Sequence, residues 1–117
     1  MVVLTNENGT IRIASEVFTT LVGDAATNCF GVKGMAIRSL SDGLVHLLKK
    51  ESMGKGVLVH FNDDDTVSIE LHIVVDQGVN IPALCSSIIS EVRYKVTSAT
   101  RVAVKSIDVY IDSIILN

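Results

Sequence analysis

Residues 57–75, VLVHFNDDDTVSIELHIVV, contain two runs of alternating apolar and polar side chains on either side of three consecutive aspartates. Strict alternation is typical of a β-strand with one buried face, and Asp favours the turn between two strands. A three-residue loop at residues 63–65 would pair Phe61 with Val67 and bring both apolar sets onto one face. The stretch therefore predicts an antiparallel hairpin whose polar face is open to water.

A long amphipathic helix is predicted directly after this hairpin. Asn80 is a good N-terminal cap, and Pro82 is tolerated in the first turn of a helix. Apolar residues then recur at helical spacing: Leu84, Ile88, Val92 and Val96. We expect a helix of roughly 18 residues that buries this stripe in the core.

The N-terminal part of the chain predicts a strand followed by a helix. Residues 1–8 are expected to be an N-terminal extension, and residues 10–13 alternate as a short strand. Ser15 is well placed to cap the helix, and Gly31 is well placed to end it in a left-handed conformation.

Three further elements complete the prediction. Residues 32–38 form a strand, in which Gly34 indicates a bulge or a close backbone approach. Residues 44–50 are expected to form a short helix with its leucines buried. In the last strand, Ile107, Val109 and Ile111 are expected to face inward. Before and after residues 107–111 the apolar residues fall on positions of the other parity. A bulge or a second covered surface would explain this change.

These elements predict one α+β domain spanning residues 1–117. Its architecture is a single mixed or antiparallel sheet of about four to five strands, with two main helices and one short helix packed mostly on one face. Periodicity identifies the buried face of each strand but not its neighbours, so the strand order stays open.

Composition and charge narrow the classes of function. The chain has 117 residues, of which 48% are hydrophobic and 20% charged, as is typical of a globular domain. Its net charge is −3 and only 4% of its residues are aromatic, so the basic stripe and stacking aromatics of a nucleic-acid-binding protein are missing. No signal peptide or membrane-spanning run is recognisable, so we expect a cytoplasmic protein without direct membrane insertion.

No residue pattern predicts a catalytic site, a cofactor site or a metal site. The histidines are expected to be ordinary surface residues: His46, His60 and His72. His60 and His72 lie too far apart along the hairpin to share a zinc ion, and the aspartates at 63–65 suit a solvated turn. Cys29 and Cys85 lie in apolar helix patterns and are expected to be small buried residues. We therefore expect no enzyme activity.

One set of apolar residues is left for the outer face of the last two strands: Val74, Tyr110, Ile114 and Leu116. Scattered exposed apolar side chains are common on globular proteins and need no explanation. Alternatively, the four residues form one patch that packs against a protein partner or a second copy of the chain. That packing would also cover an unpaired edge strand, so these residues are the candidate protein contacts.

Four motifs in the chain resemble the alkaline-shock-protein family, also called the Gls-type general stress family. They are GTIRIASEV at 9–17, AA at 25–26 with GVKGM at 31–35, IELHIVV at 69–75 with GVNIP at 78–82, and VYI at 109–111. The resemblance covers residues 9–116, and four motifs in the same order are hard to obtain by chance. DGL at 42–44 and KGV at 55–57 are similar to the short, single-domain, YloU-like branch.

The resemblance implies a cytoplasmic protein of Gram-positive-type bacteria that supports cell-envelope homeostasis or the envelope stress response. Some family members are thought to self-associate and to reach the membrane through an anchoring partner protein, and no catalytic residues are known for the family. Our leading hypothesis is a non-enzymatic protein-interaction module that forms a homo-oligomer. The alternative is an accessory protein to a dihydroxyacetone-kinase-like or fatty-acid kinase in lipid metabolism. A third hypothesis is a small-molecule or nucleic-acid binder.

Overall fold

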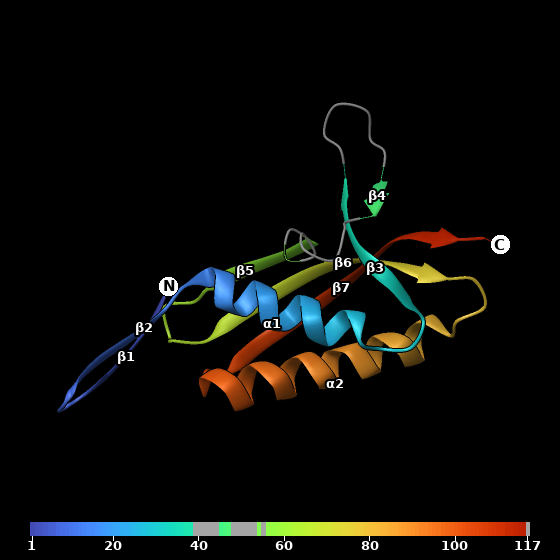
Figure 1. Ribbon diagram of the computed structural model, residues 1–117. Coiled ribbons are helices and arrows are strands. Elements are labelled where there is room, and N and C mark those ends of the chain that lie inside the picture. The colour runs from blue at the N-terminus through green and yellow to red at the C-terminus, as the bar shows by residue number, and fades with distance from the viewer. Residues whose placement is uncertain (39–44, 48–53, 55, 117) are drawn as a thin grey trace.

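The main sheet is built around strand β6 (Val67–Asp76) in the computed structural model, which describes residues 1–38, 45–47, 54 and 56–116 (Figure 1). Strand β7 (Val104–Ile115) pairs with one edge of β6 in parallel. Strands β5 (Val57–Phe61) and β3 (Val32–Arg38) pair with its other edge, both antiparallel, one after the other along β6. Strand β4 (Val45–Leu47) extends the sheet beyond β3. The sheet is therefore mixed, and the predicted α+β class is confirmed.

The predicted hairpin is confirmed in its register. Phe61 lies opposite Val67, as the alternation requires. The N–H of Asn62 donates to the carbonyl of Thr66 at 2.9 Å, which leaves residues 63–65 as the three-residue loop. Because side chains alternate along a strand, this register places the apolar residues of both strands on one face of the sheet.

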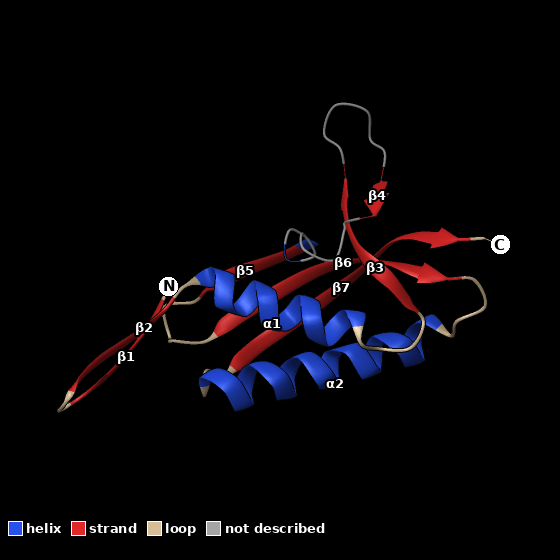
Figure 2. Ribbon diagram, viewed as in Figure 1, coloured by secondary structure: helices blue, strands red, loops and turns tan. Residues whose placement is uncertain are grey.

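Helices α1 (Ser15–Thr27) and α2 (Ile81–Thr100) both cover that apolar face, and the opposite face carries no helix within the described residues (Figures 1 and 2). The side chain of Asn80 caps α2 as predicted, since its Oδ1 accepts the N–H of Ala83 at 3.1 Å. The predicted stripe of α2 is buried: Leu84, Ile88, Val92 and Val96. Helix α2 also makes the crossover that parallel pairing of β6 with β7 requires.

β-Bulges explain two irregularities in the sequence pattern. The register of β3 shifts between Val32 and Gly34, which confirms the predicted irregularity there. In β7, Lys105 and Asp112 are the residues left without a partner on β6, so the strand has a bulge near each end. These two bulges account for the change of phase on either side of residues 107–111.

The N-terminal strand does not join the main sheet. Strand β2 (Gly9–Ile13) pairs with β1 (Val2–Asn6) in a separate two-stranded sheet that extends away from the rest of the protein (Figure 1). The predicted strand at 10–13 is thus present, but its partner comes from the residues expected to form an extension. Pairing with its sequence neighbour across a tight turn satisfies its backbone groups without the main sheet.

Three local predictions are wrong. Gly31 does not end the first helix, because α1 stops at Thr27 and its C-terminal cap is Asn28, which has a right-handed conformation. Helix α1 begins at Ser15 itself and Ala14 is the cap residue, because the chain is still extended at Ala14 (φ −75°, ψ 157°) when it leaves β2. The sequence pattern predicts a short helix at 44–50, but Val45–Leu47 form strand β4 instead. These three residues are extended because their backbone pairs with the end of β3. The other residues of that predicted helix lie outside the described residues.

Candidate functional site

The aspartate run at the tip of the β5–β6 hairpin has a structural role. Asp64 Oδ1 accepts hydrogen bonds from the Thr66 hydroxyl at 2.6 Å and from the Thr66 N–H at 3.2 Å. These two bonds hold the pKa of Asp64 below its usual value, and the bond from the Thr66 hydroxyl has the larger effect. Nowhere in the described residues do three or more His, Cys, Asp or Glu side chains form a group that could hold a metal ion.

The predicted contact residues do not form one patch on one face. Tyr110 lies opposite His72 on the outer face of the sheet and is 46% exposed. Ile114 pairs with Val75, whose side chain faces the helices, because the bulge at Asp112 has reversed the alternation. The C-terminal part of β7 therefore exposes apolar side chains towards both faces of the sheet.

Val74 is buried, with 3% of its surface exposed, so the expectation of an exposed side chain there is wrong. At this point β6 is flanked by Gly34 of β3 and Ser113 of β7, and both neighbouring strands have a bulge close by. Val74 thus lies on the central strand with a paired neighbour on each side, which alternation within one strand does not reveal.

The remaining three residues border the free edge of β7. Ile114 is 46% exposed and Leu116 is 75% exposed, and β7 pairs only with β6 among the described strands. We call this strand edge, with Tyr110, Ile114 and Leu116, the β7 edge.

A polar cluster that the sequence analysis missed lies beside the β7 edge. His72 Nδ1 is 2.9 Å from Asp112 Oδ2, and its Nε2 is 2.8 Å from Glu70 Oε2. The His72 ring also stacks on Tyr110, with ring centroids 4.7 Å apart and planes inclined at 14°. Alternation along β6 already places Glu70 on the face of His72, but the contact with Asp112 depends on the pairing of β6 with β7.

Both ring nitrogens of His72 must carry a proton to donate to two carboxylates, because an ionised carboxylate only accepts hydrogen bonds. The imidazolium form therefore fits this geometry better than the neutral ring. Partial burial acts to lower the pKa of His72, but the hydrogen bonds and charges of Glu70 and Asp112 outweigh it, and the pKa is raised.

We expect this contact to make the stability of the protein depend on pH. Because the folded-state pKa of His72 is raised, its stabilising contribution is complete below the unfolded-state pKa, which is about 6.5. The contribution is lost as the pH rises through the folded-state pKa. Urea unfolding of wild type and His72→Gln at a series of pH values from about 6 to 9 should show a steeper loss of stability in wild type.

The matched control for this prediction is His60→Gln, on the neighbouring strand β5. His60 pairs in register with Ser68, so it lies beside neither Asp112 nor the ring of Tyr110. The control should keep the pH dependence of wild type. Equal pH dependence in wild type and His72→Gln would contradict the role given to the two carboxylates.

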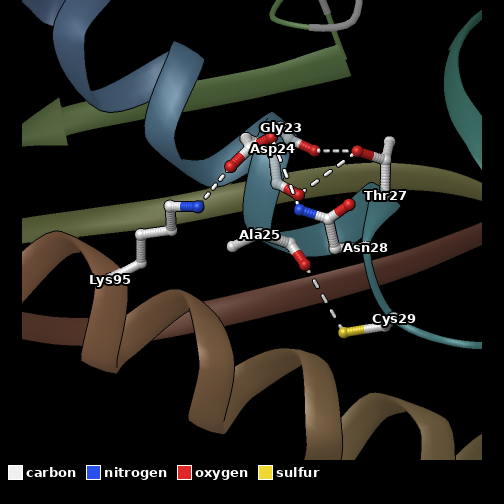
Figure 3. Close-up of polar contacts among 7 residues, drawn as sticks. All are labelled: Gly23, Asp24, Ala25, Thr27, Asn28, Cys29 and Lys95. Carbon is white, nitrogen blue, oxygen red and sulfur yellow. Dashed lines mark hydrogen bonds and ion pairs between the residues drawn. The ribbon is translucent and has the colours of Figure 1, made fainter.

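A cleft of about 690 Å³ lies on the helix side, between the end of α1, the first half of α2 and the turn that follows β6. The end of α1 is held in place by polar contacts (Figure 3). Lys95 of α2 forms an ion pair with Asp24 of α1, and Thr27 donates its hydroxyl to the carbonyl of Gly23 at 2.8 Å. The ion pair joins the end of α1 to α2, and these two helices form two sides of the cleft.

Both cysteines are free thiols. Cys29 lines the cleft, and its Sγ lies 3.5 Å from the carbonyl oxygen of Ala25 (Figure 3). Burial raises the pKa of both thiols, and the carboxylate of Glu91 raises that of Cys29 further. A raised pKa reduces the fraction of reactive thiolate, so neither Cys29 nor Cys85 has the environment of a catalytic nucleophile.

Within the described residues, the helices are too short or too polar to cross a membrane.

The chain is similar to YloU of Bacillus subtilis, at 31% identity over 95% of this chain and 92% of the relative. It is 32% identical to Spy1614 of Streptococcus pyogenes serotype M6, with the same coverage. YqhY of Bacillus subtilis is 32% identical over 88% of this chain and 75% of the relative.

A family model for the alkaline-shock-protein family, described by its "cell envelope-related function", matches residues 3–116. The match includes the hairpin, both helices and the β7 edge, and it confirms the resemblance that the motifs indicate. Since the model spans nearly the whole chain, this protein belongs to the alkaline-shock-protein family, whose function is related to the cell envelope.

Proposed function

We propose that this protein is a non-enzymatic protein-interaction module that supports the cell envelope, and that it pairs with a second copy of itself through the β7 edge. The envelope part of the proposal follows the family's description. A cytoplasmic location is the expectation of the sequence analysis, and a membrane contact through a partner protein rests on the family resemblance alone.

The free edge of β7 is the observation that carries the proposal. An unpaired edge strand presents a row of N–H and C=O groups that another strand can pair with. The side chains of a strand added at this edge also pack beside those of β7 on both faces of the sheet. Tyr110 on the outer face and Ile114 towards the helix face are placed to contact such a strand from both sides. Antiparallel pairing of two β7 strands would form a two-fold symmetric dimer with one continuous sheet.

Tyr110→Glu is expected to weaken self-association by about tenfold or more, as the loss of a central aromatic contact does in other interfaces. Sedimentation velocity over a wide range of concentrations measures this effect as a shift of the monomer–dimer equilibrium. The matched control is Tyr94→Glu, since Tyr94 is 70% exposed but lies on α2. The control should dimerise like wild type.

Tyr110 stacks on His72, so its replacement could disturb the fold as well as the contact. Leu116→Asp is the second variant, because Leu116 lies beyond the end of β7 and is 75% exposed. It should weaken the dimer and leave the urea midpoint unchanged. The self-association proposal would be wrong if wild type stayed monomeric at every concentration. It would also be wrong if Tyr110→Glu and Leu116→Asp dimerised like wild type.

A further inference from the structure

We propose that the cleft beside α2 binds an extended peptide segment of a partner protein in which a Lys or Arg lies next to aliphatic side chains. The cleft of about 690 Å³ falls within the range of roughly 300–1,000 Å³ in which proteins bind compact ligands. It lies on the helix side of the sheet, and the residues of the β7 edge are not among those that line it. The proposal therefore does not rest on self-association.

The first observation is the aromatic side chain at the mouth of the cleft. Phe30 lines the cleft and is 99% exposed. A residue this exposed could simply lie in a frayed loop, but the backbone on both sides of Phe30 is hydrogen-bonded. The carbonyl of Cys29 accepts the N–H of Val32 at 3.2 Å, and the carbonyl of Gly31 accepts the N–H of Asp76 at 2.9 Å.

The bond between Cys29 and Val32 closes a β-turn with Phe30 and Gly31 at its centre. Gly31 has φ +103°, and a positive φ at the third position is characteristic of a type II turn. The turn holds Phe30 outward, so the exposure of its ring is a built-in property of the fold. An apolar side chain of a peptide that lies in the cleft can pack against this ring.

The apolar floor of the cleft lies next to this turn. Val79 packs directly on Gly31, since a Cβ atom built on Gly31 would lie 2.8 Å from Val79 Cγ1. Leu84 of α2 also lines the cleft beside them. Phe30 and Val79 thus offer neighbouring apolar contacts at one end of the cleft.

The second observation is the charge of the cleft. The two ionised side chains that line it are both acidic, Asp76 and Glu91, and the lining contains no Lys or Arg. Asp76 has a cation close by, Lys33 at 3.8 Å, but Glu91 has no ion pair with any described residue. The electrostatic complement of this lining is a cation near Glu91.

Glu91 is placed to meet that cation inside the cleft. Ala83, Ser87 and Glu91 follow one another at four-residue spacing along one side of α2, and all three line the cleft. The positive end of the helix dipole is at the first turn and acts only within that turn, so it does not oppose a cation near Glu91. A basic side chain flanked by aliphatic ones matches the carboxylate and the apolar floor together.

The test uses the full chain and the peptide N-acetyl-Leu-Arg-Leu-amide, followed by the amide signals in ¹H–¹⁵N NMR spectra. We expect shifts at residues 28–31, 77–80 and 87–91, and tenfold or so weaker binding in Phe30→Ala. Glu91→Gln should weaken binding by about three- to fivefold, as the loss of a partly exposed ion pair does. Glu7→Gln, in the distant turn between β1 and β2, is the matched control and should bind like wild type.

Three results would overturn the proposal. Equal affinity for N-acetyl-Leu-Gln-Leu-amide would show that the charge of the cleft plays no part. Equal affinity for arginine amide alone would show a site for a small cation rather than for a peptide segment. Shifts only outside the cleft, or none at millimolar peptide, would show that the cleft does not bind it. Leu116→Asp should bind the peptide like wild type, which separates this test from that of self-association.

Discussion

Phe18→Ala is expected to lower the free energy of unfolding by about 3–5 kcal/mol. Phe18 lies on the inner side of α1 and is completely buried. Its ring meets that of Phe61 on β5 edge to face, with centroids 5.7 Å apart. Removing it takes away the aromatic contact and leaves a cavity between α1 and the sheet. Since domains of this size are stable by only about 5–15 kcal/mol, a substantial part of the total would be lost.

Urea unfolding followed by far-ultraviolet circular dichroism measures this loss. The matched control is Val17→Ala, the preceding residue on the same helix, which is 44% exposed. Its free energy of unfolding should change by less than about 0.5 kcal/mol, as is usual for surface positions. A loss below about 1 kcal/mol in Phe18→Ala would mean that the core closes over the site, contrary to the close packing described above.

Gly31→Ala is expected to lower the free energy of unfolding by about 2–5 kcal/mol, for two separate reasons. A residue with a Cβ atom is strained at φ +103°. The added Cβ would also lie 2.8 Å from Val79 Cγ1, and the β-branched Val79 has little freedom to move away.

A second glycine separates these two causes. Gly78 also has a positive φ, +87°, but a Cβ built there meets no atom within 4 Å. Gly78→Ala should therefore show the backbone strain alone, about 1–3 kcal/mol. Adding Val79→Ala to Gly31→Ala should recover the part of the loss caused by the clash, measured as a double-mutant cycle in urea. Equal losses for the two glycine variants would contradict the close contact with Val79.

The elements that could be predicted from the sequence are those specified by their own residues. The β5–β6 hairpin pairs Phe61 with Val67 because a short loop leaves no other register that buries both apolar sets. Helix α2 begins after Asn80 because a cap residue is followed at once by a four-residue apolar repeat. In both cases the signal and the structure lie within the same segment.

The features that could not be predicted depend on segments that are distant in sequence. Ala14 rather than Ser15 caps α1 because β2 holds the chain extended up to that point. Residues 45–47 form a strand because β3 provides an edge to pair with. The burial of Val74 and the contact of His72 with Asp112 require that β6 lies between β3 and β7, which periodicity within one strand does not reveal.

The two bulges of β7 have a consequence for how the protein behaves at high concentration. A long, regular and apolar strand edge can template the addition of chain after chain and so begin a fibril. In β7 the bulge residues Lys105 and Asp112 interrupt the regular ladder. They divide the pairing with β6 into a run at residues 106–111 and a shorter run at residues 113–115. An edge interrupted in this way suits one defined partner strand, and the bulges discourage open-ended polymerisation.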